Sequence, residues 1–166
     1  MAKGSGSRVA VSVPDGPCAF VTNPPLGGAL RWEGQYREGL RDGIWRVTGA
    51  EDGTPRWETT WSLGEWHGRS TSWYRNGQKT AEGEHVHGCR SGVWTHWFES
   101  GQLAARGRYD ADRKVGEWQY WNEDGEPTQY ADWQRRYDHW DWAFDDYSGM
   151  PRGENWPHPR ESTAHE

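Results

Sequence analysis

Aliphatic bulk is what this sequence lacks most. Only 33% of its 166 residues are hydrophobic, and among them are 3 Phe and 2 Met. So small an aliphatic content cannot fill the deep core of a domain built from two thick layers. No apolar run approaches the ~20 residues that a membrane-spanning helix needs. The composition therefore excludes a large aliphatic core and predicts no membrane span.

Cysteine and the short motifs of common enzymes are scarce or missing. The 2 cysteines, Cys18 and Cys89, form neither a disulfide framework nor a paired metal site. The chain has no Gly-x-Ser-x-Gly elbow, no Gly-x-x-x-x-Gly-Lys phosphate loop and no Cys-x-x-Cys pair. We therefore expect a protein that is not an enzyme, with no catalytic residues, no cofactor and no metal.

The start of the chain bears on its compartment. Residues 1–7 contain no apolar stretch of the kind that directs secretion. A chain without a disulfide framework is at home in a reducing environment. We therefore expect a cytoplasmic protein.

Tryptophan and glycine are abundant, with 14 and 22 residues. Glycine recurs every 24 residues, each time after a turn-forming Asp, Asn or Ser, and an aromatic or imidazole ring follows eight residues later. The glycines are Gly53, Gly77, Gly101, Gly125 and Gly149, and the rings are Trp61, His85, Tyr109 and Trp133. A fixed period of this length is typical of a stack of one small unit, which builds a surface rather than a catalytic pocket.

The unit is clearest in residues 92–109, where an aromatic-rich segment ends at Ser100-Gly101 and a second short segment follows. Asp-Gly and Asn-Gly favour tight turns because they tolerate positive φ. We therefore interpret each unit as a β-hairpin closed at the recurring glycine. Loops of about six residues, around 63–67, 86–90 and 110–114, are expected to lead from one hairpin to the next.

The fold that follows is all-β: an elongated single-layer antiparallel sheet of stacked β-hairpin repeats, with about ten strands at two per hairpin. A compact sandwich is the alternative. We expect a flexible N-terminal segment over 1–17, the repeat array over 18–149, and a proline-containing tail or cap over 150–166. At the front, residues 18–21 are expected to pair with 30–36. In the last full unit, Ala131 and Trp133 are expected on a second strand.

Parity along the strands assigns the faces of the sheet. Trp94, His96 and Phe98 share one face, whereas Trp97 points to the other. Trp73, Trp97 and Trp121 lie 24 residues apart and should form an aromatic ladder on that second face. One interpretation makes the ladder structural, with Trp97 as the most buried ring of the sheet. The other makes it an exposed stripe that binds a partner, with Trp97 as the main contact.

Residues 92–101 followed by Gly107-Arg108-Tyr109 follow roughly the pattern Gly-x-Trp-x-x-Tyr-x-x-Gly and Gly-x-Tyr, with Trp97 at the first Tyr position and the closing glycine one residue later, at Gly101. In this the chain resembles the MORN repeat family over about residues 30–149, and its period resembles the bacterial variant in YwqK-type antitoxins. Thr59 and Ser70 depart from the pattern, replacing a glycine and a tryptophan. The resemblance implies either an elongated scaffold, sometimes dimeric and in contact with phospholipid, or an antitoxin that neutralises a toxin encoded beside it.

A metal site is one interpretation of His85-Val86-His87-Gly88-Cys89, because alternate strand residues could converge on an ion. The other interpretation makes His85 a core ring, because it occupies the repeat position of Trp61 and Tyr109. The repeat favours the core ring.

Negative charge gathers near the C-terminal end. Residues 122–147 hold eight acids and two arginines, a balance of −6 that equals the net charge of the whole chain. The surface is either a solvated edge or the docking site of a basic protein. We expect the partner-binding residues to be Asp138, Trp140, Asp141, Trp142, Asp145, Asp146, Trp73, Trp97 and Trp121.

The function expected from these features is binding of a specific protein partner, antitoxin- or immunity-like, with a membrane-associated or assembly scaffold as the alternative. The acidic end should repel nucleic acid and anionic lipid headgroups, so neither is an expected partner. A homodimer through the edges of the sheet is a further expectation.

Overall fold

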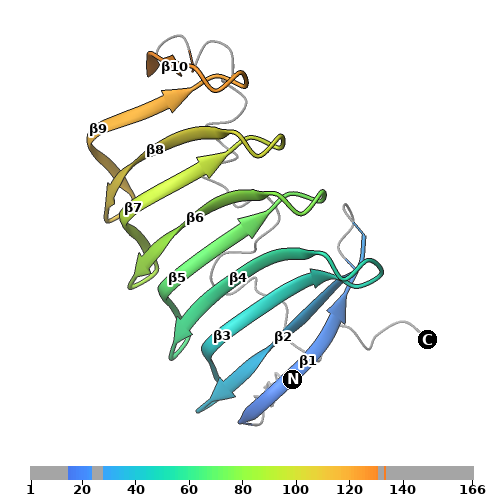
Figure 1. Cartoon of the computed structure of the whole chain (residues 1–166). Helices are drawn as coiled ribbons and strands as arrows, with labels where there is room; N and C mark the ends of the chain where they lie inside the picture. The colour runs from blue at the N-terminus through green and yellow to red at the C-terminus, as the bar shows by residue number, and fades with distance from the viewer. Residues whose placement is uncertain (1–14, 24–27, 131–132, 134–166) are drawn as a thin grey trace, which may run out of the picture.

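The computed structural model describes residues 15–23, 28–130 and 133, which form one open antiparallel sheet (Figure 1). Each strand pairs with its neighbours in the sequence, so the order in the sheet is the order in the chain. The strands are β1 (Gly16–Thr22), β2 (Leu30–Arg37), β3 (Leu40–Gly49), β4 (Pro55–Ser62), β5 (Glu65–Trp73), β6 (Lys79–Val86), β7 (Cys89–Trp97), β8 (Leu103–Asp110), β9 (Arg113–Trp121) and β10 (Pro127–Thr128). The expected single-layer sheet is confirmed, and the sandwich is excluded.

The two faces differ in burial because side chains alternate along every strand. One face, here called the core face, carries Trp32, Trp45 and Trp94, each only 1% exposed. The opposite face, here called the outer face, carries polar and half-buried side chains, among them Trp97. The expected pairing at the front is also present, with Cys18 opposite Gly34 and Phe20 opposite Trp32.

A tryptophan lying over a glycine recurs on the core face. A Cβ atom added to the glycine would overlap the indole, so only glycine lets the ring lie flat against the neighbouring strand. The indole N–H then donates to the carbonyl of the residue after the glycine, at 3.1–3.2 Å. The pairs are Gly34 with Trp45, Gly83 with Trp94, and Gly107 with Trp118.

A fourth position of this kind lies between β4 and β5, and there both residues depart from the repeat. Thr59 stands where the glycine would be, Ser70 where the tryptophan would be, and they are cross-strand partners between β4 and β5. Both are buried, at 3% exposed. The row of tryptophans over glycines is interrupted here, and the core clusters on either side are joined by ring contacts from Trp61 through Trp66 and His85 to Trp94.

The structure interchanges the two kinds of turn that the sequence predicted: the tight turns lie where loops were expected, and the wide turns lie where tight turns were expected. The tight connections are the segments expected to be loops: Leu63-Gly64, His87-Gly88 and Ala111-Asp112 each join two strands with two residues of positive φ. Positive φ at both central residues is the feature of a type I′ hairpin turn. Glu38-Gly39 makes the same turn between β2 and β3.

The wide turns lie at the recurring glycines, where tight turns were expected. At Asn76-Gly77 only the glycine has positive φ, and Asn76 instead accepts the N–H of Gln78 at 2.9 Å through its side chain. Asn therefore serves as a local side-chain cap rather than as half of a type I′ turn. The wide turn between β3 and β4 holds one residue more than the wide turns that follow it. Trp45 and Ser70 are therefore 25 residues apart instead of 24.

The end of the sheet also differs from the expectation. β10 is two residues long, and the N–H of Trp133 donates to the carbonyl of Gln129 at 2.9 Å, an i to i−4 bond of helical type. Trp133 is therefore not on a second strand, whereas Ala131 lies outside the described residues. Proline at position 127 cannot donate to a ladder, which shortens the edge. The turn of helix instead packs Trp133 against Tyr120 on the core face, at 5.2 Å between centroids.

Candidate binding surface

The three tryptophans of the expected ladder lie on the outer face, beside the wide turns. Their cross-strand partners are Lys79, Leu103 and Pro127, so an aromatic ring and a smaller side chain alternate from β5 to β10. All three rings are half-buried. Trp97 is therefore not the most buried ring of the sheet, because Trp94 on the core face is almost fully enclosed. We call Trp73, Trp97 and Trp121 the outer ladder.

Lys79 ties the outer ladder to the charged middle of the face. Its ammonium lies 5.6 Å from the ring centroid of Trp97 and 2.6 Å from a carboxylate oxygen of Glu82. Arg69 approaches the same carboxylate at 3.2 Å. Burial works to raise the pKa of Glu82, but the bonds and charges of these two cations outweigh it and hold that pKa below its usual value. Glu82 therefore stays ionised and fixes Lys79 against the ring.

Hydrogen bonds between successive wide turns hold the backbone of the ladder. The Tyr74 hydroxyl donates to the carbonyl of Trp97 at 3.0 Å, and the Asn76 amide donates to the carbonyl of Glu99 at 2.8 Å. Burial, with the charge of Glu99, raises the pKa of Tyr74, so its hydroxyl remains a donor. The wide turn at Asn76 is thereby bonded to the next wide turn, which fixes Trp73 and Trp97 relative to each other.

The edge formed by the wide turns is acidic. Its exposed carboxylates are those of Glu51, Asp52, Glu99, Glu123, Asp124 and Glu126. Bonds from Thr54 and Arg56 lower the pKa of Asp52 to about 2, so it is charged at neutral pH. The outer ladder therefore lies next to a row of negative charge within the described residues.

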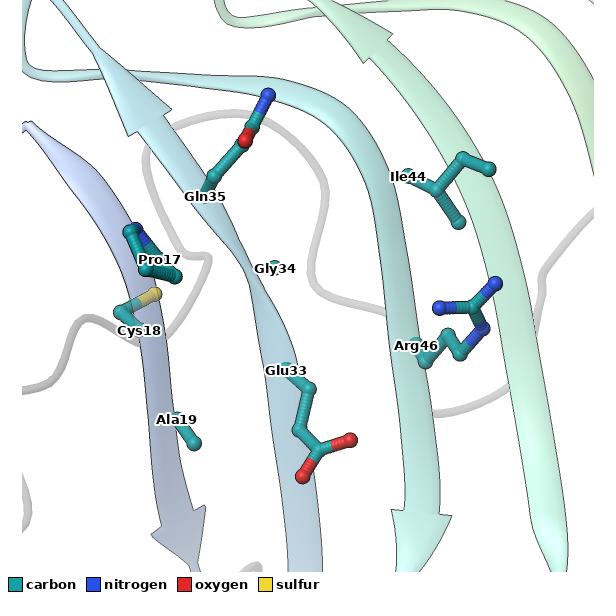
Figure 2. Close-up of a pocket in the computed structure, with 8 residues that line it drawn as sticks. All are labelled: Pro17, Cys18, Ala19, Glu33, Gly34, Gln35, Ile44 and Arg46. Atoms are coloured by element: carbon teal, nitrogen blue, oxygen red, sulfur yellow. The ribbon is translucent and has the colours of Figure 1, made fainter.

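The middle of the outer face carries charges of both signs in one cross-strand row. In the first strands the row runs Ala19, Glu33, Arg46 and Glu58. A shallow, open depression lies here, and Figure 2 shows Glu33 and Arg46 beside Gly34. Glu33 is bound by Arg31 and Arg46 by Glu58, each at 2.7 Å. Exposed ion pairs of this kind contribute little to stability, so this row is a charged part of the surface rather than a part of the core.

A second row, on the core face beside the tight turns, is mostly buried, with Lys114 exposed at its end. Cross-strand pairs there join a ring to a cation or to a second ring: Tyr36 with Arg41, Trp61 with Trp66, His85 with Arg90, and Tyr109 with Lys114. Arg41 lies 4.6 Å from the Trp45 ring, and burial lowers its pKa. His85 is 2% exposed against Trp66 and Trp94, which confirms it as a core ring.

The structure does not test the other expected partner-binding residues, and it separates the histidines of the candidate metal motif. Asp138, Trp140, Asp141, Trp142, Asp145 and Asp146 lie outside the described residues. In the candidate metal motif, His85 is buried on the core face, whereas His87 is exposed in a tight turn, so the two do not converge.

Two parts of the surface escaped sequence reasoning. Lys79 was missed, although it occupies the same repeat position as Leu103 and Pro127, 24 residues apart. Half of the acidic turn edge was missed, because Glu51, Asp52 and Glu99 are scattered along the chain. The other half, Glu123, Asp124 and Glu126, lies in the predicted acidic segment 122–147. Stacking the wide turns is what brings them together.

Within the described residues, no helix is both long and apolar enough to pass through a bilayer.

Comparison with known proteins gives one family match. No curated protein matches the chain. Residues 90–111 match the family model described as MORN repeat variant, and they cover β7 from Arg90 onward, the following wide turn, β8 and one residue beyond. This match supports the MORN-repeat family for the unit that the whole sheet repeats.

Proposed function

We propose that the protein binds a specific protein partner through the outer ladder, as an antitoxin- or immunity-like module without enzymatic activity, in the cytoplasm. The observation that carries this proposal is the set of three half-buried tryptophans at equal steps on one face. Tryptophan is enriched among the residues that dominate binding energy at interfaces. A ladder held by turn-to-turn bonds loses little freedom on binding.

The charge beside the ladder supports a basic partner. The wide-turn edge is acidic, and residues 122–147 carry the excess negative charge of the chain. Complementary charge steers encounter and suppresses wrong partners. The same charge disfavours nucleic acid and anionic membranes as partners. A homodimer through the sheet edges would use a different part of the molecule.

The test uses the product of the neighbouring gene, because antitoxins are encoded beside their toxins. We expect the two purified proteins to bind, and Trp97→Ala to weaken binding by about 30-fold, as for a residue at the centre of an interface. Ile44→Ala, an exposed apolar residue elsewhere on the outer face, is the matched control and should leave the affinity unchanged. Equal affinity for both variants would remove the ladder from the interface.

The acidic end gives a second readout of the same proposal. Changing Asp138, Asp141, Asp145 and Asp146 to asparagine should slow association, and the slowing should vanish at high salt. Association that is insensitive to salt in both forms would assign these charges to solubility alone.

The second candidate function is a membrane-associated or assembly scaffold, which the MORN repeat match favours. Flotation with vesicles of anionic lipid separates the two functions. Strong binding to such vesicles would support the scaffold, whereas the acidic balance of the chain predicts none.

A further inference from the structure

Two histidine rings from different strands meet at the tight-turn end of the sheet. His67 lies on β5, and His87 is the first residue of the turn between β6 and β7. Their ring centroids are 5.4 Å apart, with an angle of 70° between the planes. Both side chains are exposed, so enclosure in a core does not explain the contact.

A carboxylate contacts one of the two rings. The Nδ1 atom of His87 lies 3.1 Å from Oε2 of Glu65. An ionised carboxylate only accepts hydrogen bonds, so Nδ1 of His87 donates, and Nε2 of the neutral ring keeps a lone pair. A histidine whose second nitrogen donates to a carboxylate is the usual arrangement around a protein-bound metal.

The backbone fixes these residues before any ligand arrives. The N–H of Gly88 donates to the carbonyl of Trp66 at 2.9 Å, which places the His87 turn against β5 between Glu65 and His67. Gly68 pairs with His85, so the ladder of β5 and β6 sets His67 in register beside the turn. The two rings therefore come from adjacent, hydrogen-bonded parts of one sheet.

We propose that His67 and His87 bind one divalent ion of the late first-row metals, Zn²⁺, Ni²⁺ or Cu²⁺, with Glu65 orienting His87. Two imidazoles sharing a tetrahedral ion at normal bond lengths have centroids about 5 Å apart, close to the spacing observed. Imidazole suits these ions, whereas Mg²⁺ and Ca²⁺ need oxygen ligands. Within the described residues no set of three donors is placed to hold an ion, so water completes the coordination.

The experiment is calorimetric titration of the full chain, without an affinity tag and after treatment with a chelator, with Ni²⁺ and separately with Mg²⁺. We expect one Ni²⁺ per chain and no Mg²⁺. His67→Gln and His87→Asn should each weaken Ni²⁺ binding at least tenfold. Asparagine is chosen because it tolerates the positive φ of His87. Glu65→Gln should weaken binding about tenfold, because it removes the carboxylate that orients the ring.

Matched controls separate this site from other histidines and from unfolding. His158→Gln changes a histidine elsewhere in the chain and should bind Ni²⁺ like the unchanged protein, and circular dichroism should show the same sheet in every variant. The proposal is overturned if Ni²⁺ does not bind, if His67→Gln and His87→Asn bind as before, or if only His158→Gln loses binding.

Discussion

The hairpins β4–β5 and β6–β7 have the same strand register, but they carry different side chains at the same positions of the core face. In β6–β7 the indole of Trp94 lies over Gly83 and donates to the carbonyl of Glu84. In β4–β5 the same two positions hold Thr59 and Ser70. Both residues of the pair depart from the repeat together, as expected if an indole cannot lie over a threonine without overlap. The repeat therefore constrains a pair of residues rather than two separate positions.

The difference continues one step along the strand. His96 follows Trp94 on the core face of β7, and the two rings stack with centroids 6.1 Å apart. The corresponding residue of β5 is Ser72, which is also buried. The row of tryptophans over glycines is thus interrupted at β4–β5, whereas the backbone ladder and the ring contact of Trp61 with Trp66 beside the tight turn continue through it. The strands therefore pair even where no tryptophan lies over a glycine. We expect the free energy of unfolding, in contrast, to depend on which hairpins carry these rings.

The largest expected contrast comes from removing the ring. Trp94→Ala should lower the free energy of unfolding by about 3–5 kcal/mol, the cost of emptying a buried site of this size. Ser70→Ala, at the same place in β4–β5, should cost about 1 kcal/mol or less. Urea denaturation of both variants measures the contrast, and similar losses would mean that the ring contributes no special stability.

The next contrast adds a methyl group beneath the ring. Gly83→Ala places a Cβ where the Trp94 indole lies, which should cost about 1–3 kcal/mol through overpacking. Thr59→Ala should cost less, because within the described residues the buried Thr59 hydroxyl has no hydrogen-bond partner to lose. Thermal unfolding ranks the two variants, and a harmless Gly83→Ala would show that the indole can shift aside.

A double-mutant cycle tests whether the pair is coupled. Ser70→Trp alone should destabilise the fold, because the new ring meets the Thr59 side chain. Adding Thr59→Gly should recover part of the loss, with a coupling energy of about 0.5–3 kcal/mol between the two sites. Additive effects in denaturant would contradict the explanation of the joint departure.

The smallest expected contrast is in pH dependence. Burial holds the pKa of His96 at about 3, and the charges of Lys114 and Arg90 add to the effect. The unfolded chain protonates this imidazole below about pH 6.5 and the folded chain does not, so stability falls as pH falls, by up to about 1.4 kcal/mol per pH unit. His96→Phe should flatten the dependence between pH 7 and pH 5 in urea titrations. An unchanged slope would assign it to other groups.

The 24-residue period and the alternation of side chains were enough to predict the sheet, its strand number and the faces of Trp94 and Trp97. These features depend only on the spacing of residues along the chain. The turns were interchanged because Asn76-Gly77 fits two turn types, and only the backbone shows that Asn76 caps a wide one. Trp133 was misplaced because its spacing fits a strand, whereas packing on Tyr120 decided its position. His67 and His87 lie 20 residues apart, and no motif links them.

Every strand in this sheet pairs only with strands that adjoin it in sequence. Such a chain closes no long loops while folding, so ordering can begin at any hairpin and spread outward in both directions. It also means that gain or loss of 24 residues adds or removes one rung without changing the connections of the rest. Length is therefore a property that evolution can adjust in this protein while the rules of its fold stay the same.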